Sequence, residues 1–183
     1  MKTLSGLILA LSCTLVLFSI TLKAAPIPLT SSSPFISLQK GLFQSPLGFR
    51  LHSGQTGWVQ ITPPKQNNFI ETIYRAPGDN NVQAALTVRV DKTDKKYELS
   101  DYAQTWLKDY PRLGFSVLTS KKVRVGQEIG YMLDLVNRDN AKQLRQVIFL
   151  KERNVVTLTC RDDMTNFQKT LKSCNDIIRT FQW

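Results

Sequence analysis

Two cysteines near the C-terminus constrain this chain more than any other feature. Cys160 and Cys174 are the only cysteines that follow an apolar N-terminal run in the 183-residue sequence. Cys160 ends a stretch with the pattern of a β-strand, whereas Cys174 falls on the apolar stripe of a helix. We therefore predict a disulfide that joins the last strand to the last helix. Such a bond is typical of an exported protein.

The N-terminus has the pattern of a secretory signal peptide. Lys2 supplies a positive start, and residues 4–22 form an uncharged run rich in Leu, Ile, Val and Phe. Cleavage fits best after Ala24, so we assign residues 1–24 to the signal. The run is also close to the length of a bilayer span, and an uncleaved signal anchor is the alternative. Either route delivers the remaining chain across a membrane.

Cys13 adds a third alternative, because residues 10–13 read Ala-Leu-Ser-Cys and could form a lipobox whose thiol accepts an acyl chain. The apolar stretch continues past Cys13 through Leu22, whereas a lipidated chain normally turns polar directly after the cysteine. We therefore interpret Cys13 as a thiol within the signal peptide.

Residues 25–46 form a Pro/Ser-rich linker, with prolines at positions 26, 28, 34 and 46. This composition favours an extended segment without a core of its own, and we expect residues 26–45 to be dispensable for folding. Large apolar residues between Phe35 and Phe43 indicate that part of the linker packs on the domain. Residues 47–183 are long enough for one domain with a single core.

The first half of this domain is predicted to be rich in strands. We expect strands at residues 48–52, 58–61, 69–75 and 82–90, with a reversal at residues 76–80. A helix follows, capped by Ser100 or Asp101 and ended by Pro111 and Gly114. Its apolar stripe consists of Leu99, Tyr102, Ala103, Trp106, Leu107 and Tyr110.

The second half reads as consecutive strands followed by a helix. Strands are expected at residues 115–125, 129–137, 144–151 and 155–161, and the short reversals between them favour antiparallel neighbours. Thr165 and Gln168 have the spacing of a capping box at the start of the last helix. The apolar stripe of that helix is Phe167, Leu171, Cys174, Ile177, Ile178 and Phe181. The fold class is therefore α+β, an antiparallel sheet flanked by helices.

The last strand and helix carry a resemblance to a known family. The residues concerned are the run 155–160, which reads Val-Val-Thr-Leu-Thr-Cys, the stripe of the last helix and the ending Phe-Gln-Trp, with Gly57-Trp58 and Gly114-Phe115 further upstream. In these the chain resembles the Mog1/PsbP/DcrB-like superfamily, above all its bacterial exported members. The resemblance implies an α/β/α sandwich in the bacterial periplasm or cell envelope, free or membrane-tethered. The family spans photosystem accessory proteins, a nuclear-transport factor and envelope proteins, and no catalytic motif carries over.

The charge balance points to an anionic partner. The formal charge is +10, and loss of residues 1–24 leaves +8, with 22 basic and 14 acidic residues. The densest basic groups are Lys92, Lys95 and Lys96, and Lys121, Lys122 and Arg124. We expect the second group to form a surface for an anionic membrane or an acidic protein. An exported chain has little reason to meet nucleic acid, and we expect a monomer.

Residues that could support catalysis are sparse. His52 is the only histidine and has no second histidine or cysteine at metal-ligand spacing. Asp162-Asp163 is interpreted as favouring the N-terminus of the last helix, and Asp91 and Asp94 as belonging to a solvated loop. The three tryptophans, Trp58, Trp106 and Trp183, are assigned to the core.

We therefore predict no catalytic residue, no metal and no cofactor. The expected function is that of an exported, non-enzymatic accessory or assembly protein at or near a membrane complex. A binder of a small molecule or lipid, with a pocket between sheet and helix, is the alternative. An enzyme of an undetected type is the third.

Overall fold

The computed structural model describes residues 41–66, 68–77 and 84–183, all within the compact unit Ser32–Trp183. The predicted signal peptide, Cys13 and most of the linker lie outside these residues. The described strands are β1 (Leu42–Gln44), β2 (Arg50–His52), β3 (Val59–Ile61), β4 (Ile70–Arg75), β5 (Ala85–Lys92), β6 (Ser116–Val125), β7 (Glu128–Asn137), β8 (Lys142–Lys151) and β9 (Asn154–Asp163). The helices are α2 (Leu99–Asp109), the short 3-10 helix η1 (Tyr110–Leu113) and α3 (Phe167–Ile178).

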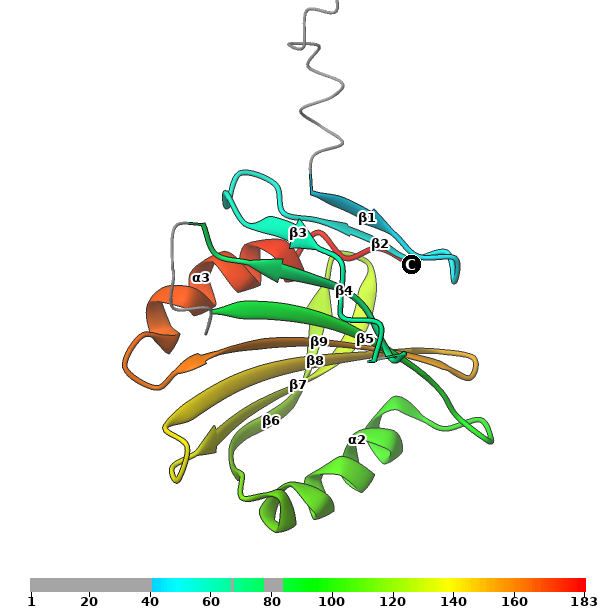
Figure 1. The fold of residues 1–183 in the computed structure, drawn as a ribbon. Coiled ribbons are helices and arrows are strands. Elements are labelled where there is room, and N and C mark those ends of the chain that lie inside the picture. The colour runs from blue at the N-terminus through cyan, green and yellow to red at the C-terminus, as the bar shows by residue number, and fades with distance from the viewer. Residues whose placement is uncertain (1–40, 67, 78–83) are drawn as a thin grey trace, which may run out of the picture. The chain divides into compact units, whose positions relative to one another are not determined.

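The main sheet has seven strands in the order β3-β4-β5-β9-β8-β7-β6, and every neighbouring pair is antiparallel. Figure 1 shows α3 on one side of this sheet and α2 on the other. The predicted fold class, an antiparallel sheet flanked by helices, is confirmed. The β5–β9 pair joins the strands before α2 to those after it, which makes one sheet of both halves.

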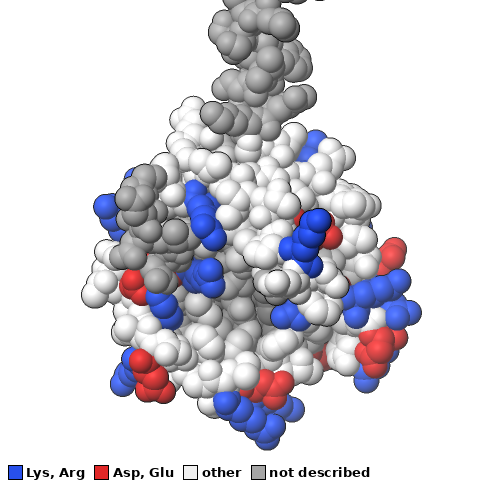
Figure 2. All heavy atoms as spheres, viewed as in Figure 1, with Lys and Arg blue, Asp and Glu red and all other residues white. Residues whose placement is uncertain are grey.

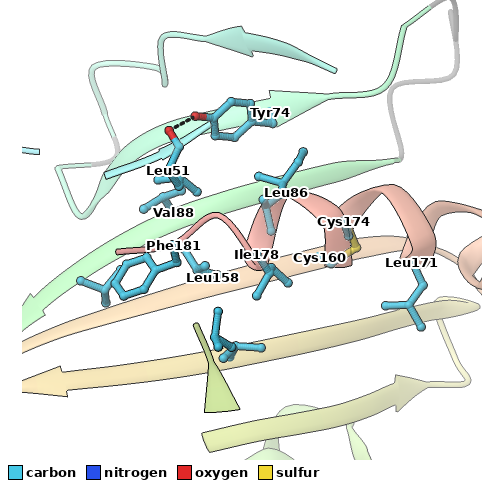
Figure 3. Close-up of a cluster of buried hydrophobic side chains, with 14 of the residues drawn as sticks. Leu51, Tyr74, Leu86, Val88, Leu158, Cys160, Leu171, Cys174, Ile178 and Phe181 are labelled. Atoms are coloured by element: carbon cyan, nitrogen blue, oxygen red, sulfur yellow. Dashed lines mark hydrogen bonds between the residues drawn. A yellow bond between two sulfur atoms is a disulfide. The ribbon is translucent and has the colours of Figure 1, made fainter. Parts of the chain in front are cut away.

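The core has two parts because both faces of the sheet are partly covered. Alternate strand residues point to opposite faces. One set, which includes Leu86, Val88 and Leu158, packs with α3, and the other, which includes Leu133 and Ile148, packs with α2. Figure 3 shows the part beneath α3, where Ile178 and Phe181 lie against the sheet. Both predicted helix stripes are buried or half-buried, as expected from their period.

The predicted helix starts are wrong in detail. Helix α2 is capped by Glu98, and Ser100 and Asp101 lie in its first turn instead. Helix α3 is capped by Asn166, and neither cap makes a side-chain hydrogen bond. Several polar residues compete for the cap near each helix start, and spacing alone does not select among them. The end of the first helix agrees with the prediction. The 3-10 helix η1 contains Pro111, and its C-cap is Gly114, with φ of 80°.

The last residues of the predicted linker form a strand. Strand β1 pairs with β2 in a separate two-stranded sheet, with Phe43 opposite Leu51. The Phe43 ring lies 5.9 Å from that of Phe49, and the Tyr74 hydroxyl donates to the carbonyl oxygens of Gly41 (3.0 Å) and Leu51 (3.2 Å). Part of this stretch therefore packs on the domain, as its large apolar residues indicated, and Leu42–Gln44 form a strand that the linker composition did not predict. The reversal expected at residues 76–80 lies mostly outside the described residues.

Candidate functional site

The predicted cysteine pair is present in the structure. Cys160 of β9 and Cys174 of α3 are joined as a disulfide, with their Cα atoms 6.0 Å apart. Both residues are fully buried in the core beneath α3 (Figure 3). The bond therefore fastens the helix to the sheet and presents no thiol at the surface.

His52 and the tryptophans have no arrangement suited to chemistry. His52 is exposed on β2, and its backbone N–H donates to the Thr180 hydroxyl at 2.9 Å. Within the described residues no group of three His, Cys, Asp or Glu side chains could hold a metal ion. Trp58 is buried, while Trp106 and Trp183 are half-buried and pack against the two parts of the core.

The predicted basic surface lies on an edge strand. Lys121, Lys122 and Arg124 are exposed on β6, which has a neighbour, β7, on one side only. In the register Lys121 is opposite Met132 of the core beneath α3, whereas Lys122 is opposite Tyr131 of the core beneath α2. The strand pleat therefore directs Lys121 to one face of the sheet and Lys122 and Arg124 to the other. The three cations share an edge rather than a face.

Elsewhere the charges are dispersed. Figure 2 shows Lys and Arg side chains scattered over the visible face, several of them beside Asp or Glu. Ion pairs join Arg145 to Asp134 at 2.7 Å and Arg89 to Asp91 at 2.8 Å. The net positive charge therefore does not collect into one continuous patch on this face.

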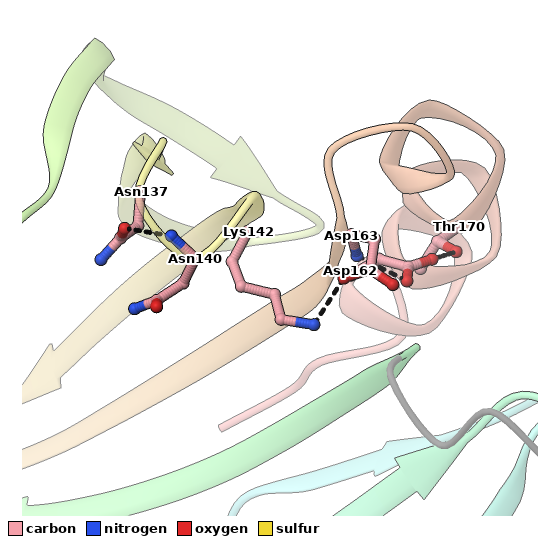
Figure 4. A network of polar contacts seen from close by, with 6 residues as sticks. All are labelled: Asn137, Asn140, Lys142, Asp162, Asp163 and Thr170. Atoms are coloured by element: carbon pink, nitrogen blue, oxygen red, sulfur yellow. Dashed lines mark hydrogen bonds and ion pairs between the residues drawn. The ribbon is translucent and has the colours of Figure 1, made fainter.

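The paired acids at the end of β9 have structural roles that differ from the predicted one. Asp162 is buried, and its carboxylate accepts a hydrogen bond from the Thr170 hydroxyl of α3. It also accepts one from the backbone N–H of Asp163 at 2.7 Å. Asp163 pairs with Lys142 of β8, as Figure 4 shows. The first carboxylate thus fastens α3 to the sheet through a side-chain hydroxyl, while the second joins two strands.

A cavity of about 250 Å³ lies between the sheet and the α2 side of the fold. Its floor consists of two rows of side chains that cross β5, β9 and β8. Thr87, Thr159 and Gln146 are direct neighbours in the first row. The second row is made of Arg89, Thr157 and Ile148. Five of these six side chains are polar, although they stand on strands whose opposite face is core.

Aromatic and apolar side chains form the walls of this cavity. Trp106 and Tyr110 come from α2 and η1, Leu113 from the end of η1, and Ile70 from β4. The Arg89 guanidinium lies 5.7 Å from the Trp106 ring and 5.5 Å from the Phe69 ring. Phe69 and Leu113 remain 61% and 57% exposed. The cavity is therefore bordered by apolar side chains and has a polar floor.

A chain of hydrogen bonds orders one side of the floor. The Tyr110 hydroxyl donates to Gln146 Oε1, and Gln146 Nε2 donates to Thr159 Oγ1 at 3.3 Å. Burial raises the pKa of Tyr110 to about 12, so this phenol stays protonated at neutral pH. Because the amide is held from both sides, the Thr159 hydroxyl proton remains available to a molecule in the cavity.

A larger depression, about 560 Å³, runs along the β3 edge, but no ionisable side chain lines it and it borders Gly41, where the described chain begins. The cavity beside α2 is therefore the better candidate for a ligand site. The residues that line this cavity could not be predicted from local patterns, because they come from elements far apart in the chain. The available signal was the alternation of polar Thr87, Arg89, Thr157 and Thr159 with buried apolar residues.

Among the described residues, no helix combines the length and the apolar character needed to cross a bilayer. No family model matches the sequence, and no curated protein matches it either. Similarity to known proteins is therefore visible only at the level of structure.

Solved structures with the same fold come from several bacteria. CyanoP, the cyanobacterial PsbP of Synechocystis sp. PCC 6803, is 11% identical with a TM-score of 0.56, over 77% of this chain and 90% of its own. PA94 of Pseudomonas aeruginosa, described as a protein of unknown function and putative regulator, is 16% identical with a TM-score of 0.55, over 77% and 94%. LpqN of Mycobacterium tuberculosis, described as involved in cell envelope biogenesis, is 14% identical with a TM-score of 0.56, over 74% and 82%.

The chain therefore shares the fold of these solved proteins, PsbP among them, which agrees with the fold that the resemblance of its last strand and helix implied. At these identities the similarity establishes the fold and leaves the function to be argued from the chain's own residues.

Proposed function

We propose that this protein is an exported, non-enzymatic accessory protein that binds an acidic segment of a partner in the cell envelope. Two observations support the compartment. The buried disulfide between Cys160 and Cys174 is typical of proteins that fold in an oxidising environment. One solved protein with this fold, LpqN, is described as involved in cell envelope biogenesis.

The basic edge of β6 carries this proposal. The strand has ten residues, includes no acid, and presents Lys121, Lys122 and Arg124 to solvent. None of these three cations forms an ion pair with any described residue. An edge strand also leaves backbone N–H and C=O groups unpaired, and an extended peptide can use them by adding a strand.

The directions of the three side chains favour a peptide over a flat surface. A planar membrane that lies against either face of the sheet meets Lys121 or the pair Lys122 and Arg124, but not all three. An added strand alternates its own side chains between both faces. Acidic residues at successive positions of such a strand could therefore reach all three cations.

The probe for this proposal is a short extended peptide with Glu at three successive positions flanked by Val, used with the exported chain, because successive side chains of a strand point to both faces. We expect binding at about 0.1 M salt that fades toward 1 M, as screening shortens the electrostatic reach from roughly 10 Å to 3 Å. The triple charge reversal Lys121→Glu, Lys122→Glu and Arg124→Glu should abolish binding. The matched control reverses Lys108, Lys169 and Lys172, three exposed cations of the two helices, and should leave binding intact.

A second peptide separates strand addition from simple charge attraction. It has the same sequence with alternate backbone nitrogens methylated, so the charge is kept while hydrogen-bond donors are lost. Unchanged binding of the methylated peptide would refute strand addition. Tighter binding to vesicles that contain phosphatidylglycerol than to either peptide would refute the acidic protein segment and favour a membrane surface.

The cavity beside α2 supports a second candidate function, a small-molecule binding protein. Such a site needs a concave surface with a few convergent polar groups, and the cavity provides both. Its polar floor makes it less suited to a lipid chain than to a polar molecule. Titration with polar ligands tests this candidate independently of the β6 edge.

A further inference from the structure

The floor of the cavity beside α2 offers three hydroxyl groups whose protons the protein itself does not use. Thr87 and Thr157 line the cavity, and their hydroxyls have no hydrogen-bond partner among the described residues. The Thr159 hydroxyl accepts from Gln146 and keeps its own proton free. Three hydroxyls on neighbouring strands therefore face the same small space, and each can donate to a bound molecule.

The charges at the cavity are already balanced. Arg89 Nη2 donates to Asp91 Oδ1 at 2.8 Å, and Arg89 Nε lies 2.8 Å from Oδ2 without a well-aligned hydrogen bond. Arg89 Nη1 keeps free donors, while the Asp91 carboxylate can accept further hydrogen bonds. The Arg89–Asp91 pair therefore offers a donor and an acceptor side by side, and its net charge is zero.

The walls add an apolar component of limited size. Trp106 and Tyr110 present ring surface whose centroids are 6.2 Å apart, beside a volume of about 250 Å³. Sites for drug-sized ligands have roughly 300–1,000 Å³. The space is therefore suited to one small ring with C–H groups that can contact an aromatic side chain.

From this combination we infer that the cavity binds a small, neutral, polyhydroxylated ligand the size of a single sugar ring. Its hydroxyls contact Thr87, Thr157, Thr159 and the Arg89–Asp91 pair, and its C–H face lies against Trp106. The inference rests on the second candidate function above and names the ligand class for that site. The ligand is either a free sugar or the terminal residue of an envelope glycan.

Other ligand classes fit these groups less well. An anion would meet the Asp91 carboxylate next to Arg89, and a cation would meet the guanidinium. A wholly apolar ligand would cover the three threonine hydroxyls without giving them a partner, which costs binding free energy. A neutral polyol is the class that satisfies both donors and acceptors.

The test is a titration of the exported chain by calorimetry and by saturation-transfer NMR. Glucose, N-acetylglucosamine and inositol are the free probes, and the methyl glycosides of the two sugars represent a glycan terminus. Citrate, inorganic phosphate and decanoate represent the competing classes. Binding of at least one polyol is expected, with NMR saturation transferred to its ring C–H protons. Tighter binding of a methyl glycoside than of its free sugar assigns the ligand to a glycan terminus, and the reverse assigns it to a free sugar.

The double variant Thr87→Val and Thr157→Val removes two hydroxyls but keeps the shape and strand preference of both residues. Each lost hydrogen bond weakens binding by roughly two- to tenfold, so the pair should reduce affinity about four- to hundredfold. Thr119→Val makes the same change on β6, outside the cavity, and should have no effect. Thermal melts of all variants identify any loss of fold.

Three outcomes would overturn the inference. These are no binding of any polyol up to its solubility limit, preferred binding of citrate, phosphate or decanoate, and polyol binding that the double variant leaves unchanged. A failure here is distinguishable from a failure of the β6 proposal. The double variant leaves the β6 cations in place, so its binding of the acidic peptide should equal that of the unmodified chain.

Discussion

Removal of the disulfide should destabilise the domain by a predictable amount. Cys160 and Cys174 are separated by 14 positions, so the bond closes a loop of about 15 residues. In the chain-entropy model a loop of about this length restricts the unfolded chain by about 3 kcal/mol. The double variant Cys160→Ala and Cys174→Ala is the cleaner perturbation, because serine would bury two hydroxyls in an apolar core.

A loss of about 3 kcal/mol corresponds to a fall of roughly 10 °C in Tm for a domain of this size. Urea unfolding followed by circular dichroism gives the free energy directly. Because the bond acts mainly on the unfolded chain, we expect an unchanged native spectrum and a slightly larger m-value in the variant, whose unfolded chain exposes more surface.

Two results would refute this reasoning. Thiol titration of denatured, unreduced protein that starts at Ala25 should find no free thiol, and two free thiols would show that the bond is not formed. Equal urea midpoints for the variant and the disulfide-bonded protein would show that α3 is held to the sheet by packing alone. The single variants, which leave one buried thiol each, serve as controls for the loss of sulfur packing.

Two further predictions follow from buried contacts. Burial raises the pKa values of Tyr74, Tyr102 and Tyr110, the last to about 12 from the usual tyrosine value of about 10. The contribution of Tyr110 to stability is therefore complete below about pH 10 and is lost as pH rises toward 12. In urea unfolding between pH 8 and 12, Tyr110→Phe should therefore lose about 2–3 kcal/mol less stability than the unmodified chain, and parallel curves would contradict this. A protein that starts at Ser45 lacks β1 and the Phe43 contact, and should be about 2 kcal/mol less stable than one that starts at Gly41; equal stability would show that residues up to 44 are dispensable, as their composition suggested.

The helices and the second half of the sheet could be predicted from sequence because their signals are local. Six residues at helical spacing define the buried side of each helix, and short reversals join β6 to β9 as antiparallel neighbours. The β5–β9 pair could not be predicted in this way. It joins Ala85 to Arg161, and no local pattern selects one strand partner over another across such a separation.

The two candidate sites, the β6 edge and the cavity beside α2, also differ in how far local sequence patterns predict them. Lys121, Lys122 and Arg124 are neighbours in the sequence, so their grouping is visible there, whereas the pleat of β6 divides them between the two faces of the sheet. The cavity combines Thr87, Thr157 and Trp106 from three separate elements. Its position depends on strand order and on the place where α2 packs, and both are set by tertiary structure.

The polarity of the strands explains why a cavity forms beside α2. Helix α2 has 11 residues, so it is about 16 Å long and about 10 Å wide, whereas strands are spaced about 4.8 Å apart. It covers about two of the seven strands if it runs along them and about three to four if it crosses them, and it packs on β7 and β8.

Those two strands are mainly apolar toward α2, with Tyr131, Leu133 and Ile148 in the core, and Gln146 of β8 already belongs to the polar floor of the cavity. The next strands, β9 and β5, carry Thr157, Thr159, Thr87 and Arg89 on the same face. The change from apolar to polar side chains therefore marks the edge of the area that α2 covers. The cavity lies at this boundary, where the indole of Trp106 stands on the same face as Thr87 and Thr157, whose hydroxyls have no hydrogen-bond partner among the described residues.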